Sequence, residues 1–257
     1  MRFACVGLLA AILFGGIACR RSESTNNVAR GEVTVAAAAN LTQVFQDLGP
    51  QFESQTGIHP VFSFASTAQL TQQIENSAPF DVIAAADAEH VDELDRKNLL
   101  VKGSVAVYAI GVLALWIPAR SGAAIRTIED LVLPQVQIIA VAKPEVAPYG
   151  QATVDTLHRL GIWGKVNSKL VYAENISMAK QYGTSGNADA VFTAYSLVLK
   201  EPGNIIQVDD NLHRPIKQEL GIVAKSQHQD AAHKFVDFLL QGKGKDILRI
   251  YGYRVAG

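Results

Sequence analysis

Two short turns, each between a run with strand character and a run with helical spacing, most constrain the fold of this chain. The first covers residues 35–42 (VAAAANLT) and the second covers residues 64–70 (FASTAQL). Their small side chains let the backbone approach a ligand closely, and Asn40, Ser66 and Thr67 add side-chain donors. A helix N-terminus offers unpaired backbone N–H groups and the positive end of a dipole, and both favour an anion. Two such turns therefore predict a pocket that holds a small oxyanion by hydrogen bonds.

The segments around these turns alternate between strand and helix. We expect strands at 32–37, 61–64 and 81–85. We expect helices at 41–57, at about 67–74, and from an N-cap at Asp87 through residue 94. This order indicates an α/β fold with a mainly parallel, doubly wound sheet. Pro50 lies inside the first helical pattern, and we expect it to kink or interrupt that helix.

A long apolar run at residues 105–117 (VAVYAIGVLALWI) exceeds an ordinary strand but is too short to span a membrane. A strand that continues from one lobe into another explains this length. Beyond it we expect a second α/β unit, with strands at 137–141, 170–173 and 190–194 and helices at 152–160 and 177–182. An extended segment at 218–224 can return the chain to the first lobe, which ends in a helical region. The predicted lobes are 31–110 with 222–257, and 111–221.

The N-terminus has the pattern of a targeting segment. Arg2 precedes an apolar stretch at 3–17, and small residues follow it. The junction at Cys19 resembles a bacterial lipobox, although Gly16 replaces the usual leucine. We therefore expect residues 1–19 to be a lipoprotein-type signal peptide, with lipidation at Cys19 and an extracytoplasmic location. Ordinary secretion with cleavage nearby is the alternative.

The mature chain is expected to fold without a disulfide. Cys5 lies in the removed segment and Cys19 would be modified, so no cysteine remains for pairing. Residues 20–30 (RRSESTNNVAR) are polar and without pattern, which is typical of a flexible tether. The 49% of hydrophobic residues supports a substantial core in the domain that follows.

Charge and motifs argue against nucleic acid binding and against catalysis. The chain has 23 Lys and Arg against 24 Asp and Glu, whereas nucleic-acid-binding proteins usually carry a basic excess. The six histidines are scattered and show no metal-ligand spacing. Residues 183–187 (GTSGN) lack the last glycine of a nucleophile elbow. We therefore expect neither an enzyme nor a cofactor.

Four segments together resemble the extracytoplasmic molybdate-binding proteins of ABC importers. They are VTVAAAANL at 33–41, FSFASTAQLTQQIENSAPFDVIAAAD at 62–87, IAVAKPEVAPYGQATVDTLHRLGIW at 139–163, and YAENISMA at 172–179. The resemblance runs over nearly all of the mature chain. It implies a two-lobed periplasmic-binding-protein fold (type II-like), with the ligand in the cleft, a membrane permease as partner and a monomeric state.

The same resemblance implies a set of ligand-binding residues. The family has Ser or Asn at the end of the first strand and a hydroxyl residue in the second turn. From the second lobe it uses backbone N–H groups after a proline and at a helix start. Some members add a tyrosine from a late strand, where this chain has alanine. The matching or neighbouring positions are Ala39, Asn40, Ser66, Thr67, Tyr149, Ile176 and, one residue after that alanine, Tyr195.

The proposed contacts share one property: none is acidic and none is Lys or Arg. Molybdate is a tetrahedral dianion without a proton at neutral pH, so a pocket made of donors suits it. A hydrogenphosphate site also needs an acceptor. Sequence alone leaves tungstate, sulfate or another oxyanion as alternatives on the same scaffold. A secreted α/β hydrolase or transferase, and a ligand-sensing domain, are alternatives from other classes.

Overall fold

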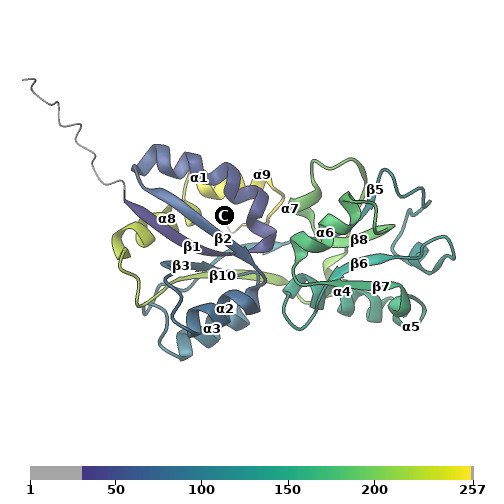
Figure 1. Ribbon diagram of the computed structural model, residues 1–257, viewed down its shortest axis with the longest axis horizontal. Helices are drawn as coiled ribbons and strands as arrows, with labels where there is room; N and C mark the ends of the chain where they lie inside the picture. Colours follow the sequence, from purple (N-terminus) through teal and green to yellow (C-terminus); the bar gives the residue numbers. More distant parts are fainter. Residues whose placement is uncertain (1–30, 256–257) are drawn as a thin grey trace, which may run out of the picture.

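Two five-stranded sheets, one in each lobe, organise residues 31–255, which this computed structural model describes (Figure 1). The predicted signal peptide, tether and Cys19 lie outside the described residues. The first sheet has the order β2-β1-β3-β10-β4 and the second the order β7-β6-β8-β5-β9. In both sheets the central strands are buried on both faces, which explains their almost continuous apolar sequences.

The first lobe combines the N-terminal part of the chain with its C-terminal helices. Its strands are β1 (Glu32–Ala38), β2 (His59–Ala65), β3 (Val82–Ala84), β4 (Ala106–Gly111) and β10 (Ile216–Ile222). The helices α1 (Thr42–Thr56), α8 (Gln229–Leu240) and α9 (Lys243–Ile250) cover one face, and α2 (Thr67–Glu75) and α3 (Glu89–Arg96) cover the other (Figure 1). A short 3-10 helix, η1 (Ala39–Leu41), joins β1 to α1.

The second lobe has the same layered arrangement. Its strands are β5 (Leu113–Pro118), β6 (Ile139–Ala142), β7 (Leu170–Ala173), β8 (Ala190–Ala194) and β9 (Gly203–Gln207). The helices α4 (Pro148–Arg159) and α5 (Trp163–Val166) lie on one face, and α6 (Ile176–Thr184) and α7 (Tyr195–Val198) lie on the other (Figure 1). Further 3-10 turns lie at Glu129–Val132, Asn167–Lys169 and Asp210–Leu212.

The chain crosses between the lobes twice. The first crossing is Val112, which separates β4 of the first sheet from β5 of the second. The apolar run at 105–117 is therefore one extended stretch shared by two lobes, as predicted. The second crossing, residues 208–215, returns the chain from β9 to β10. The predicted boundary at residue 222 thus falls at the end of a strand that belongs to the first sheet.

Each sheet is mixed in direction, which refines the expected mainly parallel arrangement. Strand β1 pairs in parallel with β2 and β3, and β6 pairs in parallel with β7 and β8. The strands next to the crossings, β4, β5, β9 and β10, form the antiparallel pairs. A strand that directly follows a crossing starts at the interface between the lobes, so β5 and β10 run against the other strands of their sheets, whereas β4 and β9, which precede a crossing, run with them.

Pro50 does not interrupt α1, which was one of the two outcomes predicted, since the helix is continuous from Thr42 to Thr56. The proline removes the hydrogen bond that the carbonyl of Gln46 would accept. Both residues are exposed, so water can satisfy that carbonyl. Helix α9 begins at Lys243, directly after Gly242, which is its N-cap. Within residues 31–255, no helix has the length and apolar character that crossing a membrane requires.

Candidate functional site

A small cavity lies where the two lobes meet, at the ends of strands and the starts of helices. The space between its walls, including the solvent at its mouth, is about 210 Å³, so only a small molecule or ion fits there. The residues that line it are Ala38, Ala39, Asn40, Ala65, Ser66, Thr67, Ala86, Ala147, Pro148, Tyr149, Asn175 and Ile176. None of these side chains carries a charge, so any anion bound here must be stabilised by neutral dipoles.

Three helices begin at this cavity, and the first turn of a helix has N–H groups without an intrahelical acceptor. Ser66 is the N-cap of α2 and Asn175 is the N-cap of α6. Helix α4 begins with Pro148, whose missing N–H and fixed φ suit the first helical position. The Asn175 side chain caps α6 by accepting a hydrogen bond from the Met178 N–H at 2.9 Å. The positive ends of three helix dipoles therefore surround one small space.

Asn40 and Ser66 each present a buried polar atom without a protein partner among the described residues. Asn40 is 1% exposed, and its Nδ2 donates to Gln218 Oε1 at 3.0 Å and to Tyr253 Oη at 2.8 Å. Its Oδ1 and the Oγ of Ser66 have no hydrogen-bond partner. Unpaired buried polar atoms cost free energy, and two of them in the wall of one cavity indicate a missing ligand.

Thr67 has a structural role in addition to its place in the wall. Its Oγ1 accepts a hydrogen bond from the Ala86 N–H at 3.1 Å, and this ties the start of α2 to the end of β3. A hydroxyl that accepts one bond keeps its own proton free to donate. Thr67 can therefore donate to a ligand while it holds the neighbouring strand end in place.

The second lobe contributes main-chain groups rather than free side chains. Tyr149 is 1% exposed, and its Oη contacts Gln218 Nε2 at 2.9 Å, away from the Tyr149 backbone. Burial raises the pKa of this phenol well above its usual value, so it stays protonated. The Ile176 side chain packs into the core of the lobe. The donors left on this side are the N–H groups of Tyr149 in α4 and of Ile176 and Ser177 in α6, because those of Gly150 and Met178 are already bonded within their helix starts.

Six of the seven predicted binding positions line this cavity: Ala39, Asn40, Ser66, Thr67, Tyr149 and Ile176. Tyr195 does not. It begins α7, its N–H donates to the Val112 carbonyl at 2.9 Å, and its ring packs against Gly252. The sequence analysis missed Asn175 and the residues behind the cavity, above all Gln218. No sequence signal marked Gln218, because it lies between Lys217 and Glu219 in β10 and only the structure shows that it is buried.

Hydrogen bonds join the lobes around the cavity. Ser177 Oγ of α6 donates to the Ala39 carbonyl at 2.8 Å, and the Ala68 N–H of α2 donates to the Val146 carbonyl at 3.4 Å. Ser196 Oγ of α7 donates to the Asn40 carbonyl at 3.2 Å. The lobes are thus in contact across the cleft, and the cavity lies between them.

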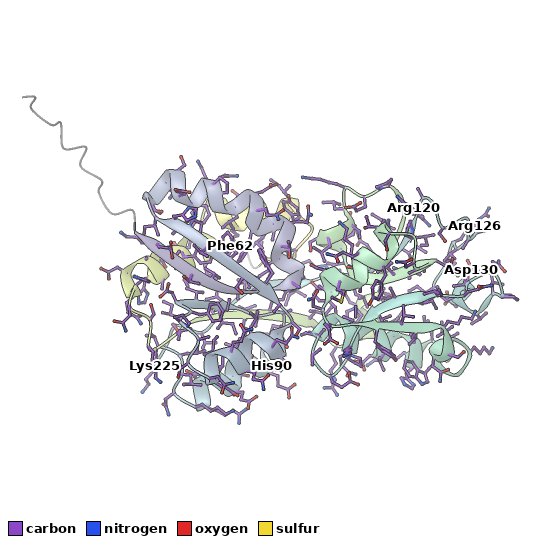
Figure 2. The ribbon with its side chains drawn as sticks, viewed as in Figure 1. Phe62, His90, Arg120, Arg126, Asp130 and Lys225 are labelled. Carbon is purple, nitrogen blue, oxygen red and sulfur yellow. The ribbon has the colours of Figure 1, made fainter. Side chains whose placement is uncertain are left out.

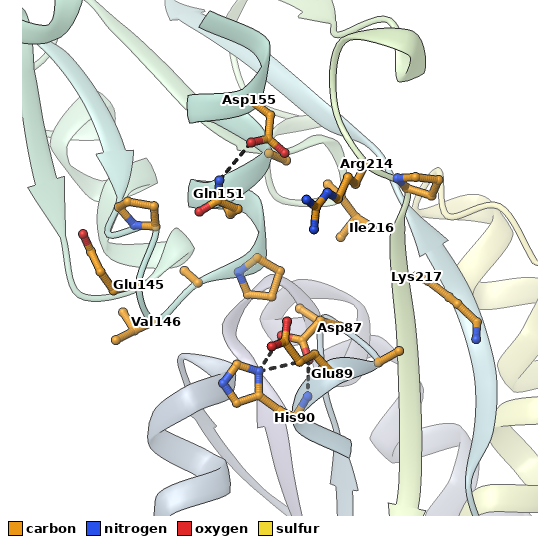
Figure 3. A pocket seen from close by; sticks show the side chains of 17 residues that line it. Asp87, Glu89, His90, Glu145, Val146, Gln151, Asp155, Arg214, Ile216 and Lys217 are labelled. Carbon is orange, nitrogen blue, oxygen red and sulfur yellow. Dashed lines mark hydrogen bonds and ion pairs between the residues drawn. The ribbon is translucent and has the colours of Figure 1, made fainter. Parts of the chain in front are cut away.

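A second, larger cavity, of about 1080 Å³ on the same measure, lies beside the first and differs from it in charge (Figure 3). Its charged and titratable side chains are Asp87, Glu89, His90, Glu145, Asp155, Arg214 and Lys217. A hydrogen bond to Asp87 raises the pKa of His90 above its usual value. Four carboxylates against two permanent cations do not suit a dianion. The small uncharged cavity is therefore the better candidate.

Other charged groups lie far from the small cavity. Figure 2 shows Arg120, Arg126 and Asp130 at the end of the second lobe that faces away from the first. Asp130 Oδ2 accepts hydrogen bonds from the backbone N–H groups of Arg126 and Thr127, which lowers the pKa of its carboxyl. The part of the chain that the structure describes contains no cluster of three or more His, Cys, Asp or Glu residues able to hold a metal ion.

Comparison with known proteins places the chain in a family. The family described as bacterial extracellular solute-binding protein matches residues 33–254. A molybdate-binding protein ModA of Rhodobacter capsulatus is 37% identical over 232 residues, which cover 88% of this chain and 89% of that protein. A ModA of Azotobacter vinelandii is 35% identical over 257 residues, covering 98% and 99%. The solved structure of the Azotobacter vinelandii periplasmic molybdate-binding protein gives a TM-score of 0.84 at 30% identity, over 88% of this chain and all of that one. The chain therefore belongs to the bacterial extracellular solute-binding proteins.

Proposed function

We propose that this chain binds molybdate outside the cytoplasm and delivers it to the membrane permease of an ABC importer. The observation that carries the proposal is the small cavity, whose wall holds two unpartnered buried polar atoms and three helix N-termini but no charged side chain. The relatives that match almost the whole chain are named molybdate-binding proteins. Both lines of support concern binding, and neither involves a chemical reaction.

Neutral donors can supply enough free energy for tight binding. A hydrogen bond to a charged group contributes about 1.5–3 kcal/mol. The cavity offers hydroxyls from Ser66 and Thr67 and main-chain N–H groups at three helix starts. A handful of such bonds corresponds to sub-micromolar affinity, about −8 kcal/mol, after the costs of association. Because both lobes supply donors, closure of the lobes should accompany binding.

Two alternatives differ from this proposal in chemistry. Tungstate and sulfate share the charge and shape of molybdate, so discrimination among the three would depend on the size of the cavity. A hydrolase or transferase would need a nucleophile with a base in reach. None of the residues that line the cavity is a histidine, an acid or a lysine, which disfavours that alternative.

The cellular setting follows from the sequence and the family. We propose an extracytoplasmic monomer anchored by a lipid on Cys19, with residues 20–30 as the tether. The family name describes extracellular proteins, which supports the location. The proposed role requires no cofactor and no nucleic acid. Mass spectrometry of the membrane-extracted protein would detect the lipid on Cys19, and an unmodified Cys19 would overturn the anchor.

Thermal unfolding of the chain without residues 1–19, with molybdate, tungstate, sulfate or phosphate added, tests the binding proposal. A ligand that binds only the folded state raises its stability by mass action. We expect molybdate and tungstate to raise the unfolding temperature at lower concentration than sulfate, and phosphate to have little effect. Stabilisation by phosphate but not by molybdate would contradict the proposal.

A further inference from the structure

Behind the small cavity lies a buried network of six polar side chains that connects the two lobes. We call it the amide–phenol network: Asn40, Tyr108, Tyr149, Ser196, Gln218 and Tyr253. All six are 6% exposed or less. Gln218 is at its centre, within 3.0 Å of Asn40, 2.7 Å of Tyr108 and 2.9 Å of Tyr149. The orientation of its amide therefore decides which atoms of its neighbours donate.

The number of protons in the network restricts that orientation. Burial raises the pKa of Tyr108 well above its usual value and that of Tyr253 to about 12, so each phenol carries one proton. The Tyr108 Oη faces two acceptors, the Ala85 carbonyl at 2.8 Å and Gln218 Oε1 at 2.7 Å, with one proton to donate. The Tyr149 Oη faces a donor, Gln218 Nε2, and its own proton has no acceptor within residues 31–255. With the Asn40 Oδ1, three groups are left unsatisfied.

A half rotation of the two amides about their terminal bonds satisfies all three groups and leaves the heavy-atom distances unchanged. Tyr108 then donates to the Ala85 carbonyl and accepts from Gln218 Nε2. Tyr149 donates to Gln218 Oε1. Gln218 Nε2 also donates to Asn40 Oδ1 over the 3.0 Å contact, and Tyr253 can donate to the same oxygen over its 2.8 Å contact. The amide atom of Asn40 that faces the cavity becomes Nδ2.

We propose that Gln218 is a positioning residue. By donating a hydrogen bond to Asn40 Oδ1, Gln218 directs the N–H group of the Asn40 amide into the cavity. The cavity then selects oxyanions that carry no proton. This inference rests on the proposed function and adds the residue that sets the polarity of the site. With Oδ1 facing inward, the cavity would offer an acceptor, and hydrogenphosphate would gain a partner for its O–H group. With Nδ2 inward, that O–H group loses the amide acceptor, and only the Ser66 and Thr67 hydroxyls, which also serve as donors, can accept from it.

The Tyr149 phenol and the Gln218 amide lie directly over the backbone of Gly111. A Cβ at Gly111 would lie 2.2 Å from Tyr149 Oη and 2.3 Å from Gln218 Nε2. Glycine at this position, next to the Val112 crossing, therefore lets side chains from both lobes meet directly over the strand. The contact between Tyr149 and Gln218 belongs to the arrangement in which the lobes enclose the cavity.

Nuclear magnetic resonance of the ¹⁵N-labelled protein tests the orientation directly. The side-chain amide signals of Asn40 and Gln218 are assigned by their loss in the variants Asn40→Ser and Gln218→Met. On saturation with molybdate, verified by calorimetry, we expect the Asn40 amide signals to move strongly and those of Gln218 to move little. Unmoved Asn40 signals in the molybdate-bound protein would overturn the inference alone. Absence of binding by calorimetry would overturn the proposed function, and the inference with it.

The selectivity of Gln218→Met tests the positioning role. Methionine keeps the length of the side chain but cannot hold the Asn40 amide, so either amide atom can face the cavity. We expect the ratio of molybdate to hydrogenphosphate affinity to fall about tenfold or more, which corresponds to one hydrogen bond to a charged ligand. Thr193→Val is the matched control, since this buried hydroxyl in β8 has no described partner and lies outside the network. An affinity ratio in Gln218→Met equal to that of the control would contradict the proposal.

Discussion

One wall of the cavity is made of side chains, and the other is made of main-chain groups. The first lobe presents side chains: the amide of Asn40 and the hydroxyls of Ser66 and Thr67. The second lobe presents the starts of α4 and α6, where the Tyr149 and Ile176 side chains are committed elsewhere. The first wall is therefore specified by residue type, whereas the second is specified by the path of the backbone. Substitutions in the two walls should have opposite consequences.

The largest effect is expected where the backbone of the second wall is displaced. A Cβ at Gly150 would lie 2.3 Å from the Ala142 carbonyl oxygen, so Gly150→Ala must move the start of α4 or the end of β6. Overpacking of this kind costs about 1–3 kcal/mol of stability. We expect molybdate affinity to fall by at least about a hundredfold, because N–H groups at this helix start lose their alignment. Calorimetry and urea unfolding measure the two effects.

Gly164→Ala in the same lobe is the control for this substitution, because a Cβ there meets no atom within 4 Å. It should leave both quantities close to those of the unaltered protein. A Gly150→Ala protein that binds molybdate normally would show that the second wall does not depend on the position of α4.

Alkaline pH should destabilise the amide–phenol network, which lies behind both walls of the cavity. Burial raises the pKa of Tyr253 from 10.0 to about 12, and a shift of two units corresponds to about 3 kcal/mol. A raised pKa in the folded state means that this stabilisation is complete below pH 10 and is lost as the pH rises through 12. Urea unfolding across this range should show the decline, and Tyr253→Phe should reduce its steepness. A flat stability profile to pH 12 would contradict the buried position of the phenols.

Ser66→Ala tests the role of the hydroxyl in binding. Ser66 is also the N-cap of α2, in a capping box with Gln69, so its removal weakens the start of that helix as well. We expect molybdate affinity to fall about tenfold or more, and the unfolding free energy to fall by about 0.5–2 kcal/mol. Calorimetry and urea unfolding of the same preparation measure both. Unchanged affinity would remove the hydroxyl from the site.

Thr67→Ala is the informative comparison for Ser66→Ala. We expect it to weaken molybdate binding with the fold intact, but it also leaves the Ala86 N–H without its acceptor. Its unfolding free energy should therefore fall by about 1–3 kcal/mol. An unfolding free energy of Thr67→Ala equal to that of the unaltered protein would show that the hydrogen bond between Thr67 and Ala86 contributes little.

The smallest effect on binding is expected from a side chain of the second wall. Ile176→Val shortens a core residue but keeps the N–H group at the start of α6. Stability should fall by about 0.5–1.5 kcal/mol, while molybdate affinity changes less than about threefold, since no ligand bond is removed. A larger loss of affinity would mean that the Ile176 side chain itself contacts the ion.

The contrast between the walls also explains what the sequence could predict. Asn40, Ser66 and Thr67 were identified because strand ends and helix starts are local features that favour particular residue types. The N–H groups at Tyr149 and Ile176 were reached only through family resemblance, since every residue except proline carries this group. Gln218 was missed because its partner Asn40 is 178 positions away in the sequence.

The direction of the crossing strands and the course of α1 past Pro50 were likewise not predicted in detail. Strand direction depends on where the chain re-enters a sheet, and local periodicity contains no information on that. The tolerance of Pro50 depends on its exposure, which results from the packing of the whole helix.

The two crossings at Val112 and at 208–215 have a consequence for how the protein can open. The two connections between the lobes define an axis. Rotation of one lobe relative to the other about this axis is the motion that the connections restrain least. Sliding or twisting of one lobe on the other would stretch at least one connection. Release of the ion should therefore follow a single angular path, along which the contacts farthest from this axis separate first.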